Sequence, residues 1–362
     1  MNTLPEEWIW TPLPPDAELE TAAILKATIT AQQYLAELKG ISQTMPNRNI
    51  LLSTLPLQEA QDSSEVENIV TTQDALFKSK LSGISETDHA TKEVSRYVTA
   101  LNTGFERIRQ DGLLTTRHII AIQQQLEDND AGIRALAGTR LSNPRTGEII
   151  FVPPQDKSII LRALDNLEQF MNDDEMSSLH PLIKMSIIHY QFESIHPFYD
   201  GNGRTGRIIN MLYLVKEGLL DLPILYLSRF VIRNKSDYYR LLQRVRTHQD
   251  WESWIIFMLQ GVAETSRDTI RVITGIRTLM KQYKKGIREQ FPFYSQDLIN
   301  HLFRHPYSKI AHLQHDLSIS RPTASKYLEE LTAAGYLEKI KEGRENYFLN
   351  PRLLRILSGD SP

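Results

Sequence analysis

The sequence predicts a mainly α-helical fold with one β-hairpin near its middle and a small α+β domain at its C-terminal end. Apolar residues recur at helical spacing through most of the 362 residues, one short stretch alternates around turn residues, and the C-terminal stretch reads as helices followed by two strands. A chain of this length is expected to hold two or three domains.

Helices dominate the first third of the chain. After a proline-rich arm, residues from about 17 to 125 alternate helix-type apolar spacing with polar breaks, as in AELETAAILKATITAQQYLAELKG. The same spacing returns after the hairpin and is interrupted at DLPILYLS. We therefore expect an N-terminal helical extension over residues 1–100 and a helical core over residues 101–275.

The hairpin is predicted inside that core. In LAGTRLSNPRTGEIIFVPPQ, the turn residues Asn143, Pro144 and Gly147 lie between a short alternating run and the β-rich EIIFV. This pattern indicates a β-hairpin at about residues 136–153, with helices on both sides.

The C-terminal domain is expected to span residues 285–362. Three helix-like segments precede two short strands that turn at Gly343, an order typical of a winged helix-turn-helix. Residues 301–350 hold seven Lys and Arg against six Asp and Glu, which is a weak electrostatic footprint for DNA. The sequence therefore favours protein contact, target selection or dimerisation for this domain, with DNA binding as an open alternative.

Composition narrows the class of protein further. The formal net charge of −3 gives no global attraction to nucleic acid or to an anionic membrane. Without cysteine the chain has neither a disulfide nor a thiolate nucleophile. The acidic N-terminus does not read as a signal peptide, and no apolar stretch approaches the ~18 residues of a membrane span. We expect a cytoplasmic protein without a membrane partner.

The run HPFYDGNGRTGR, residues 196–207, predicts an anion site between two helices. Pro197 disfavours the α region for His196, so the preceding helix should end there and leave the histidine ring at the mouth of a site. Gly201 and Gly203 permit positive φ and carry no Cβ, so backbone N–H groups can converge on an anion at the start of the next helix. This describes a cradle for phosphate.

The charged residues of the run suggest a reaction. Arg204 and Arg207 are three residues apart in the first turn of a helix, so two guanidinium groups could hold neighbouring phosphates. Asp200 could hold a Mg²⁺ that bridges phosphate oxygens. His196, with an ordinary pKa of about 6.5, could take a proton from a hydroxyl. The residues point to transfer of a phosphate-containing group to that hydroxyl.

Two other interpretations of the run are weaker. GNGRTG also satisfies G-x-G-x-x-G, with Asp221 near the position of a ribose acid, but a dinucleotide fold needs an apolar strand that leads into the first glycine. A capped surface turn would explain GNG alone, but not a base, an acid, glycines and paired arginines together. Neither a P-loop motif nor H-E-x-x-H occurs.

These residues resemble the signature of the Fic (filamentation induced by cAMP) family, His-Pro-Phe-x-Asp/Glu-Gly-Asn-Gly-Arg-x-x-Arg. The lead-in HYQFESIHPF, the VPP after the hairpin and SDYYRLL downstream are also similar, so the resemblance covers about residues 60–260. It implies a Fic-type helical core in which the hairpin is a flap that pairs with a target. The N-terminal extension and winged helix resemble bacterial members with a three-part layout.

The resemblance implies a protein adenylyltransferase that moves AMP from ATP to a Ser, Thr or Tyr hydroxyl of a target protein or of itself. His196 would be the general base, Phe198 would pack inward to fix the loop, and Asp200 would bind Mg²⁺. The residues expected at ATP are Gly201, Asn202, Gly203, Arg204, Thr205, Gly206, Arg207 and Tyr239, with Tyr238 as an alternative to Tyr239. Removal of AMP by the same site, and a homodimer, stay open.

The segment SSEVEN, Ser63 to Asn68, resembles the family's inhibitory motif, Ser/Thr-x-x-x-Glu-Gly/Asn. In that motif the glutamate, here Glu67, pairs with the second arginine, here Arg207, and blocks the position of the γ-phosphate. Ser64-x-x-Glu67 is also a capping box that would start a helix, and both interpretations could hold together.

Two other functions stay open at this point. A Fic-type enzyme could use another phosphate-containing donor, although the intact Gly-Asn-Gly and both arginines favour a nucleoside triphosphate. A transcriptional regulator could instead sense ATP through a slow or silent catalytic domain and act through its winged helix.

Overall fold

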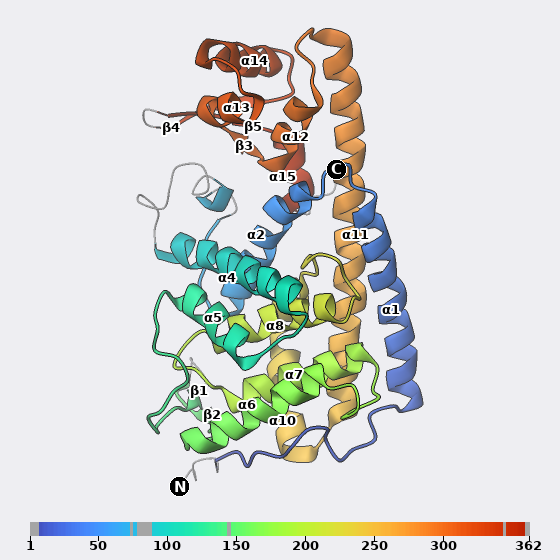
Figure 1. Ribbon diagram of the computed structural model, residues 1–362, viewed down its shortest axis with the longest axis vertical. Helices are drawn as coiled ribbons and strands as arrows, with labels where there is room; N and C mark the ends of the chain where they lie inside the picture. Colours follow the sequence, from blue (N-terminus) through green and yellow to red (C-terminus); the bar gives the residue numbers. More distant parts are fainter. Residues whose placement is uncertain (1–6, 73–74, 78–88, 143–145, 343–344, 359–362) are drawn as a thin grey trace.

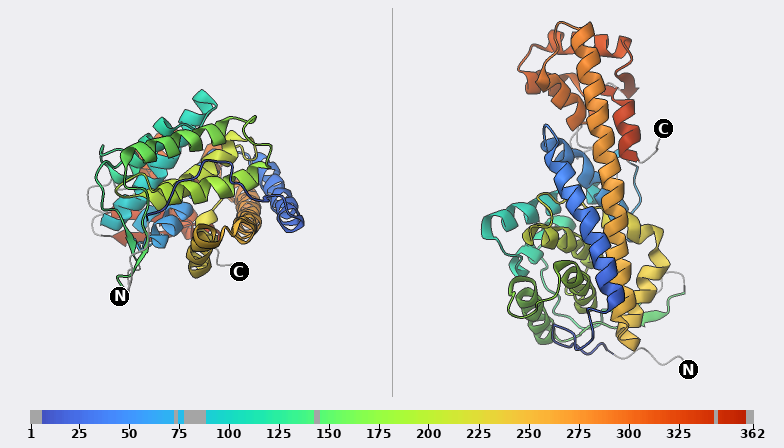
Figure 2. Two further views of the ribbon diagram at one scale, coloured as in Figure 1. Left: turned by 90° about the horizontal axis from the view of Figure 1, so that it is seen from below. Right: turned by 90° about the vertical axis from the view of Figure 1, so that its right-hand side faces the viewer.

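One long helix, α11 (Trp251–Gln290), runs along the side of the molecule and connects a large helical part with a smaller C-terminal part (Figures 1 and 2). The computed structural model describes residues 7–72, 75–77, 89–142, 146–342 and 345–358. Within these ranges helices predominate, so the prediction of a mainly α fold with a small C-terminal α+β region is confirmed.

The helices and strands follow one another along the chain in this order: α1 (Ala22–Gln43), α2 (Asn49–Val66), α4 (His89–Asp111), α5 (Thr116–Glu127), β1 (Leu141–Ser142), β2 (Ile149–Phe151), α6 (Lys157–Asn172), α7 (Pro181–Ile195), α8 (Asn202–Lys216), α9 (Leu227–Arg233), α10 (Lys235–His248), α11 (Trp251–Gln290), α12 (Gln296–Arg304), β3 (Tyr307–Ser308), α13 (Ile310–Leu317), α14 (Arg321–Ala333), β4 (Glu338–Glu342), β5 (Glu345–Leu349) and α15 (Pro351–Ser358).

Helix α1 packs lengthwise against α11, as both views in Figure 2 show. Thr21 starts the helix by accepting a hydrogen bond from the N–H of Ile24 at 3.3 Å. Ile24, Ala31 and Leu38 are seven residues apart and fully buried, so they lie on one face of the helix. The N-terminal extension therefore packs against α11 through this buried face of α1.

Helix α7 lies in the centre of the core, between α6, α8 and α11. Nearly all of its residues are buried, which explains why its sequence is apolar on every side rather than on one stripe. No helix among the described residues has the length and apolar character to cross a membrane. The loop from His196 to Gly201 connects α7 with α8, so the candidate site is mounted between two rigid, buried helices.

The predicted hairpin is present as β1 and β2. The two strands are antiparallel, with Leu141 opposite Phe151 and Ser142 opposite Ile149. The turn residues Asn143 and Pro144 lie outside the described residues. Most of the surrounding segment is exposed loop, so the paired part is shorter than the expected 136–153.

The C-terminal part contains α12, α13 and α14 followed by β4 and β5, as predicted. Two elements were not predicted: β3, which completes a sheet of order β3-β5-β4, and α15. Tyr307 and Ser308 of β3 pair with Leu349 and Phe348 of β5, and a strand of two residues is too short to leave a periodic signal in the sequence. Gly343, the predicted turn, lies outside the described residues. The winged-helix interpretation stays a prediction.

A glycine allows α4 to approach its neighbours closely, and we expect Gly104→Ala to destabilise the protein. A Cβ at Gly104 would lie 2.8 Å from Cδ1 of Ile122 in α5 and closer still to Cδ1 of Leu212 in α8. We expect a loss of about 1–3 kcal/mol, measured by denaturant unfolding. Gly40→Ala is the matched control, because nothing lies within 4 Å of its Cβ and alanine favours the helix by about 0.5–1 kcal/mol. A stability gain in both variants would contradict the expected overpacking.

Candidate active site

The loop after α7 begins as the sequence predicts. Helix α7 ends at Ile195, and His196 adopts the left-handed conformation, with φ 49° and ψ 58°. Its N–H still donates to the carbonyl of Phe192 at 3.0 Å, which closes the last turn. The chain thereby turns sharply at His196 and leaves the ring half-buried beside the start of α8.

Asn202 and Phe198 close the loop. The N–H of Phe198 donates to Oδ1 of Asn202 and Nδ2 of Asn202 donates to the carbonyl of Phe198, both at 2.9 Å. The ring of Phe198 is fully buried, as expected of an inward anchor. Because the side chain of Asn202 is used in this clamp, its backbone N–H is the group left for an anion.

Gly201 and Gly203 are required for different structural reasons. Gly201 has φ +77° and is the N-cap of α8, as expected for the turn into the helix. Gly203 lies inside α8 and does not use the positive φ that a glycine permits. A Cβ at Gly203 would instead collide with the carboxylate of Glu67. Gly203 therefore provides room beside the helix rather than freedom in the backbone.

The N-terminus of α8 has the features of an anion site. No described side chain caps it, so its first backbone N–H groups are available to a ligand. Asp200 is exposed next to this end and accepts a hydrogen bond from the N–H of Gly201 at 2.7 Å. A Mg²⁺ held by this one carboxylate and by phosphate oxygens would fit such a position.

Arg134 fixes the backbone around His196, and sequence reasoning missed it. Its side chain is fully buried and donates from Nε to the carbonyl of His196 at 2.7 Å and from Nη2 to that of Ile195 at 3.3 Å. Nη2 also donates to the carbonyl of Pro154, beyond β2. One guanidinium therefore joins the hairpin to the loop. Arg134 is the single charged residue of AGIRALAG and belongs to no recognisable motif, so the sequence gives no sign that it holds the backbone of the loop.

Electrostatics keep His196 neutral. Burial lowers the pKa of His196 to about 4, and the neighbouring guanidinium groups of Arg134 and Arg246 lower it in the same direction. The imidazole is therefore a free base near neutral pH and can accept a proton.

Arg204 is already paired with carboxylates. Its Nη2 lies 2.8 Å from Oε1 of Glu127 and its Nη1 lies 3.5 Å from Oε1 of Glu93, with the arginine side chain buried. A Cβ at Gly201 would strike the same Glu127 side chain, so this carboxylate fills the space beside the loop. The sequence predicted the arginine but not its two acidic partners, which come from α5 and α4.

Arg207 makes the predicted contact with the SSEVEN segment. Its Nη2 lies 2.7 Å from Oε1 of Glu67 and donates to the carbonyl of Ser63 at 2.8 Å, while Nε donates to Oγ of Ser63 at 2.8 Å. Burial alone would raise the pKa of Glu67, but the Arg207 guanidinium outweighs burial and lowers it. Glu67 is therefore ionised at neutral pH and occupies the outer nitrogen of Arg207.

The capping-box interpretation of Ser64 and Glu67 is wrong. Ser64 lies in the last turn of α2, which ends at Val66, and Glu67 is its C-cap. The following residue, Asn68, has φ 65°, which ends the helix. A helix ends at the motif rather than beginning there, because the apolar pattern that needs burial lies upstream of it, in residues such as Leu51 and Leu55.

The two tyrosines of α10 have different environments. Tyr238 is buried, and its hydroxyl lies 2.8 Å from Nε2 of His189. Tyr239 is 48% exposed and its ring meets that of Tyr238 edge-on, with 5.1 Å between centroids. Of the two candidates, Tyr239 therefore presents a ring that a ligand could reach.

Thr205 and Gly206 lie in the first turns of α8 and face the interior. Thr205 is fully buried, and a Cβ at Gly206 would lie 2.7 Å from Oε1 of Glu193. Burial raises the pKa of Glu193 to about 7. The N–H of Thr205 donates to the carbonyl of Gly201 at 2.9 Å, so it is used within the helix and is not free for an anion. Glu193 adds a second titratable group near the loop that sequence reasoning missed.

The dinucleotide interpretation of GNGRTG fails on the surrounding structure. The segment before the first glycine follows helix α7 rather than a strand, and the segment after it is α8. Asp221 pairs with Lys39 at 3.4 Å and with Arg48 at 3.6 Å, far from the role of a ribose acid. A loop between two helices that presents a base and an uncapped helix end defines a different class of phosphate site.

Comparison with known families identifies that class. Three family models match, described as Fic/DOC family N-terminal (residues 25–106), Fic/DOC family (113–214) and protein adenylyltransferase SoFic-like, C-terminal domain (279–353). The chain belongs to the Fic/DOC family, with the N-terminal and C-terminal regions of that architecture.

Individual relatives match over shorter stretches. The protein adenylyltransferase Fic of Drosophila grimshawi is 33% identical over 92 residues, 25% of this chain and 18% of the relative, and that of Drosophila persimilis is 34% identical over 92 residues, 25% of this chain and 17% of the relative. The match thus spans less than a fifth of these curated relatives.

Solved structures share the fold over more of the chain. A Fic family protein from Desulfovibrio desulfuricans G20 aligns with a TM-score of 0.56 at 20% identity over 94% of this chain and 98% of that one. A Fic domain containing signaling protein from Bacteroides thetaiotaomicron VPI-5482 aligns with a TM-score of 0.52 at 18% identity, over 70% of this chain and 97% of that one.

Proposed function

We propose that this protein is an adenylyltransferase that moves AMP from ATP to a protein hydroxyl and is restrained by Glu67. The observation that supports this most directly is the pairing of a neutral base, His196, with the uncapped N-terminus of α8 on one clamped loop. Family membership and the adenylyltransferase relatives point to the same reaction.

His196 takes the proton of the target hydroxyl in the proposed reaction. The hydroxyl oxygen attacks the α-phosphorus of ATP, the bond to the bridging oxygen breaks, and pyrophosphate leaves with Arg204 and Arg207 near its charge. The pKa of about 4 means that His196 begins the step unprotonated at neutral pH. Its orientation depends on Arg134, which holds the carbonyl of the same residue.

The phosphates would lie on the backbone N–H groups at the start of α8. Gly201, Asn202 and Gly203 form the start of that turn. Mg²⁺ at Asp200 would neutralise charge on the phosphate oxygens. The half-exposed ring of Tyr239 is the candidate wall for the adenine.

The target protein would be presented by the hairpin. Strand β2 is paired with β1 and joins, through Pro154, the arginine that holds the catalytic loop. An extended target segment that pairs with this hairpin as an added strand would bring a Ser, Thr or Tyr hydroxyl to a fixed height above His196. Self-modification would use a segment of the chain itself.

The test uses ATP labelled at either the α- or the γ-phosphate. Protein that carries Glu67→Gly is incubated with Mg²⁺ and each label, alone and with cell lysate, and compared with the same protein that also carries His196→Ala. We expect protein to be labelled from α-labelled ATP only. His196→Ala should lower the labelling rate by at least about a hundredfold, because general base catalysis contributes 10²–10⁴-fold.

Each other outcome points to a different function. Label transferred from the γ-phosphate would mean phosphoryl transfer, with the nucleotide in a kinase-like orientation. Equal α-labelling with and without His196 would remove the histidine from the reaction. Absence of transfer from both labels, with ATP still bound, would favour another donor or a nucleotide sensor.

A further inference from the structure

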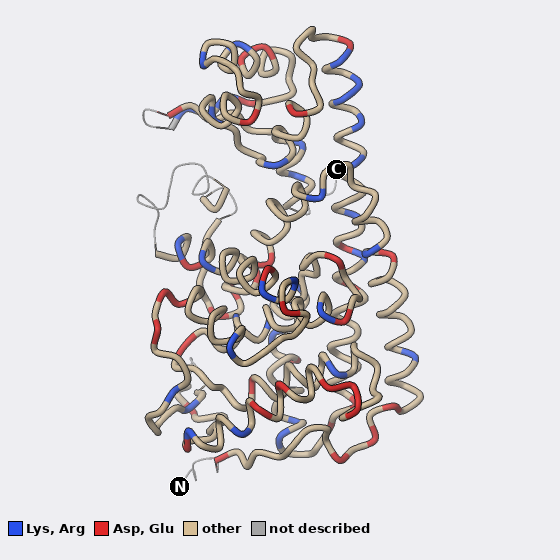
Figure 3. Tube along the Cα trace, in the orientation of Figure 1, with Lys and Arg blue, Asp and Glu red and all other residues tan. Residues whose placement is uncertain are grey.

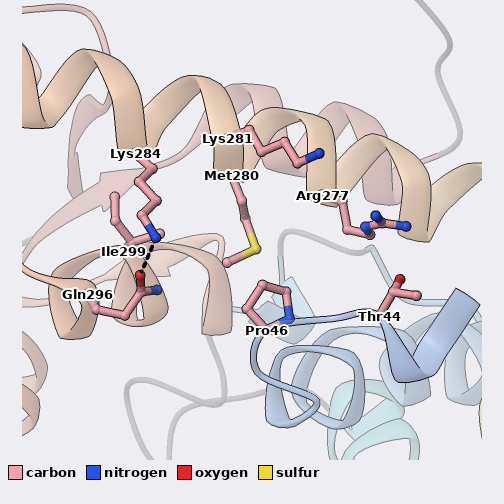
Figure 4. A pocket seen from close by; sticks show the side chains of 8 residues that line it. All are labelled: Thr44, Pro46, Arg277, Met280, Lys281, Lys284, Gln296 and Ile299. Atoms are coloured by element: carbon pink, nitrogen blue, oxygen red, sulfur yellow. Dashed lines mark hydrogen bonds between the residues drawn. The ribbon is translucent and has the colours of Figure 1, made fainter.

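A cleft outside the Fic loop lies where the N-terminal and C-terminal parts of the chain meet α11. It has a volume of about 220 Å³. Its lining comes from the α1–α2 connection, from α11 and from α12: Thr44, Pro46, Arg277, Met280, Lys281, Lys284, Gln296 and Ile299. Figure 4 shows Met280 near its centre, Lys284 and Gln296 toward one end, and Arg277 and Lys281 toward the other. We call it the α11 cleft.

The charge around the α11 cleft is strongly positive. Residues 271–290 of α11 contain six Lys and Arg against one Glu, and Figure 3 shows blue segments repeated along this upper stretch of the helix. Arg277, Lys281 and Lys284 follow at intervals of four and three residues, so they project from one face of the helix. Three cations therefore border one small cavity.

These cations lack acidic partners within the described part of the chain. Lys284 donates to Oε1 of Gln296 at 3.0 Å, a neutral acceptor, and neither Arg277 nor Lys281 forms an ion pair there. Elsewhere on the same helix, Arg271 pairs with Asp268. Two positive groups at one end of the α11 cleft are thus uncompensated, which favours an anion.

The floor of the α11 cleft is apolar. Met280 and Ile299 are buried and, with the ring of Pro46, form a surface beside the cations. An inorganic anion would leave this apolar surface exposed to water, whereas a flat apolar group joined to the anion would cover it. The α11 cleft therefore suits a ligand that carries both an anionic group and an apolar group.

The cationic face is too short for a polymer. Lys285, four residues after Lys281, does not line the cleft, and Arg288 donates to the hydroxyl of Tyr294 at 3.1 Å and lies over its ring. In the other direction the helix continues with Ile273 and Thr274, which carry no charge. A nucleic acid strand needs charges that continue along a groove, so the pattern matches a small molecule.

We propose that the α11 cleft binds a small organic phosphate, a phosphate monoester of a flat apolar group. Arg277 and Lys281 hold the phosphate, and the apolar group lies on Met280 and Pro46. The proposal is independent of the adenylyltransferase reaction, since no residue of the α11 cleft belongs to the loop 196–207.

Phenyl phosphate is the probe, titrated into the full chain by calorimetry, with inorganic phosphate and phenol as comparators. We expect saturable binding of phenyl phosphate at one site per chain, tighter than that of either comparator. Arg277→Gln with Lys281→Gln should weaken it by at least about tenfold, because a hydrogen bond to a charged group contributes about that factor. Thr44→Glu, which adds a carboxylate beside the cations, should weaken it as well.

The matched control is Arg271→Gln with Lys285→Gln, which removes the same charge from the same helix outside the α11 cleft. It should leave the affinity within about twofold. Equal weakening by both double variants, binding of phenol as tight as that of phenyl phosphate, or no saturable binding would overturn the proposal. Arg207→Ala should not change the affinity; loss of binding in that variant would place the probe in the Fic loop and leave the proposed reaction untouched.

Discussion

Glu67→Gly is expected to raise the rate of AMP transfer to protein by at least about tenfold. The carboxylate of Glu67 occupies Nη2 of Arg207, the arginine that the proposed reaction places near the leaving pyrophosphate. Removing it returns that nitrogen to the ligand, and tenfold corresponds to only about 1.4 kcal/mol, a modest value for an ion pair with one side 35% exposed. The initial rate of labelling from α-labelled ATP measures the effect.

Glu65→Gly is the control for Glu67→Gly. Glu65 lies in the same last turn of α2 and is exposed, so the substitution introduces the same glycine without touching Arg207. Its rate should match that of the unaltered protein. If Glu65→Gly activated as strongly as Glu67→Gly, a loosened helix end rather than the lost carboxylate would be the cause.

Glu59→Gln is expected to remove a large part of the loss of stability between pH 5 and pH 8. Burial raises the pKa of Glu59 from 4.5 to about 8. The folded protein accommodates the protonated carboxyl, so the contribution of Glu59 to stability is fully present below about pH 4.5. This contribution is lost as pH rises through about 8, because the folded protein must then hold a buried charge. The loss from this one group is on the order of 3–5 kcal/mol.

Glutamine can replace the protonated acid in its contacts. Glu59 accepts from the N–H of Ser228 at 3.2 Å and from the hydroxyl of Tyr97 at 3.2 Å, and an amide can accept from the first and donate to the second. In denaturant unfolding at pH 5, 6.5 and 8, the free energy of unfolding of Glu59→Gln should increase relative to that of the unaltered protein as pH rises. Glu65→Gln, an exposed neighbour, should follow the unaltered protein; a parallel pH dependence for all three proteins would contradict a buried acid at position 59.

Local chemistry explains what could be predicted. The end of α7 at His196 follows from Pro197, whose ring restricts the residue before it, and the anchor at Phe198 follows from a motif that fixes residue types over twelve positions. The hairpin was visible because turn residues separate its strands. Each of these signals lies within a few residues of the feature it predicts.

Contacts between distant segments could not be predicted in this way. Arg134 reaches the carbonyl of His196 across 62 positions, and Glu127 reaches Arg204 across 77. A single arginine in a loop or a single glutamate in a helix has the pattern of an ordinary surface residue, and its burial depends on how distant segments pack. The capping-box alternative at Ser64 fails for a similar reason, because Ser-x-x-Glu can also occur at the end of a helix, and packing decides which end forms.

The attachment of α2 bears on how fast the proposed restraint could be lifted. The body of the helix is anchored: Oγ of Ser53 donates to the carbonyl of Arg304 at 2.9 Å, and Asp62 pairs with Arg229 at 3.1 Å. Glu67 lies beyond these anchors, at the C-cap of the helix. Arg207 can therefore be freed when one terminal turn frays, a motion of nanoseconds to microseconds, while the helix itself stays in place. Restraint of this kind would lower the average rate by the fraction of time that Glu67 is paired, instead of switching the enzyme between two long-lived states.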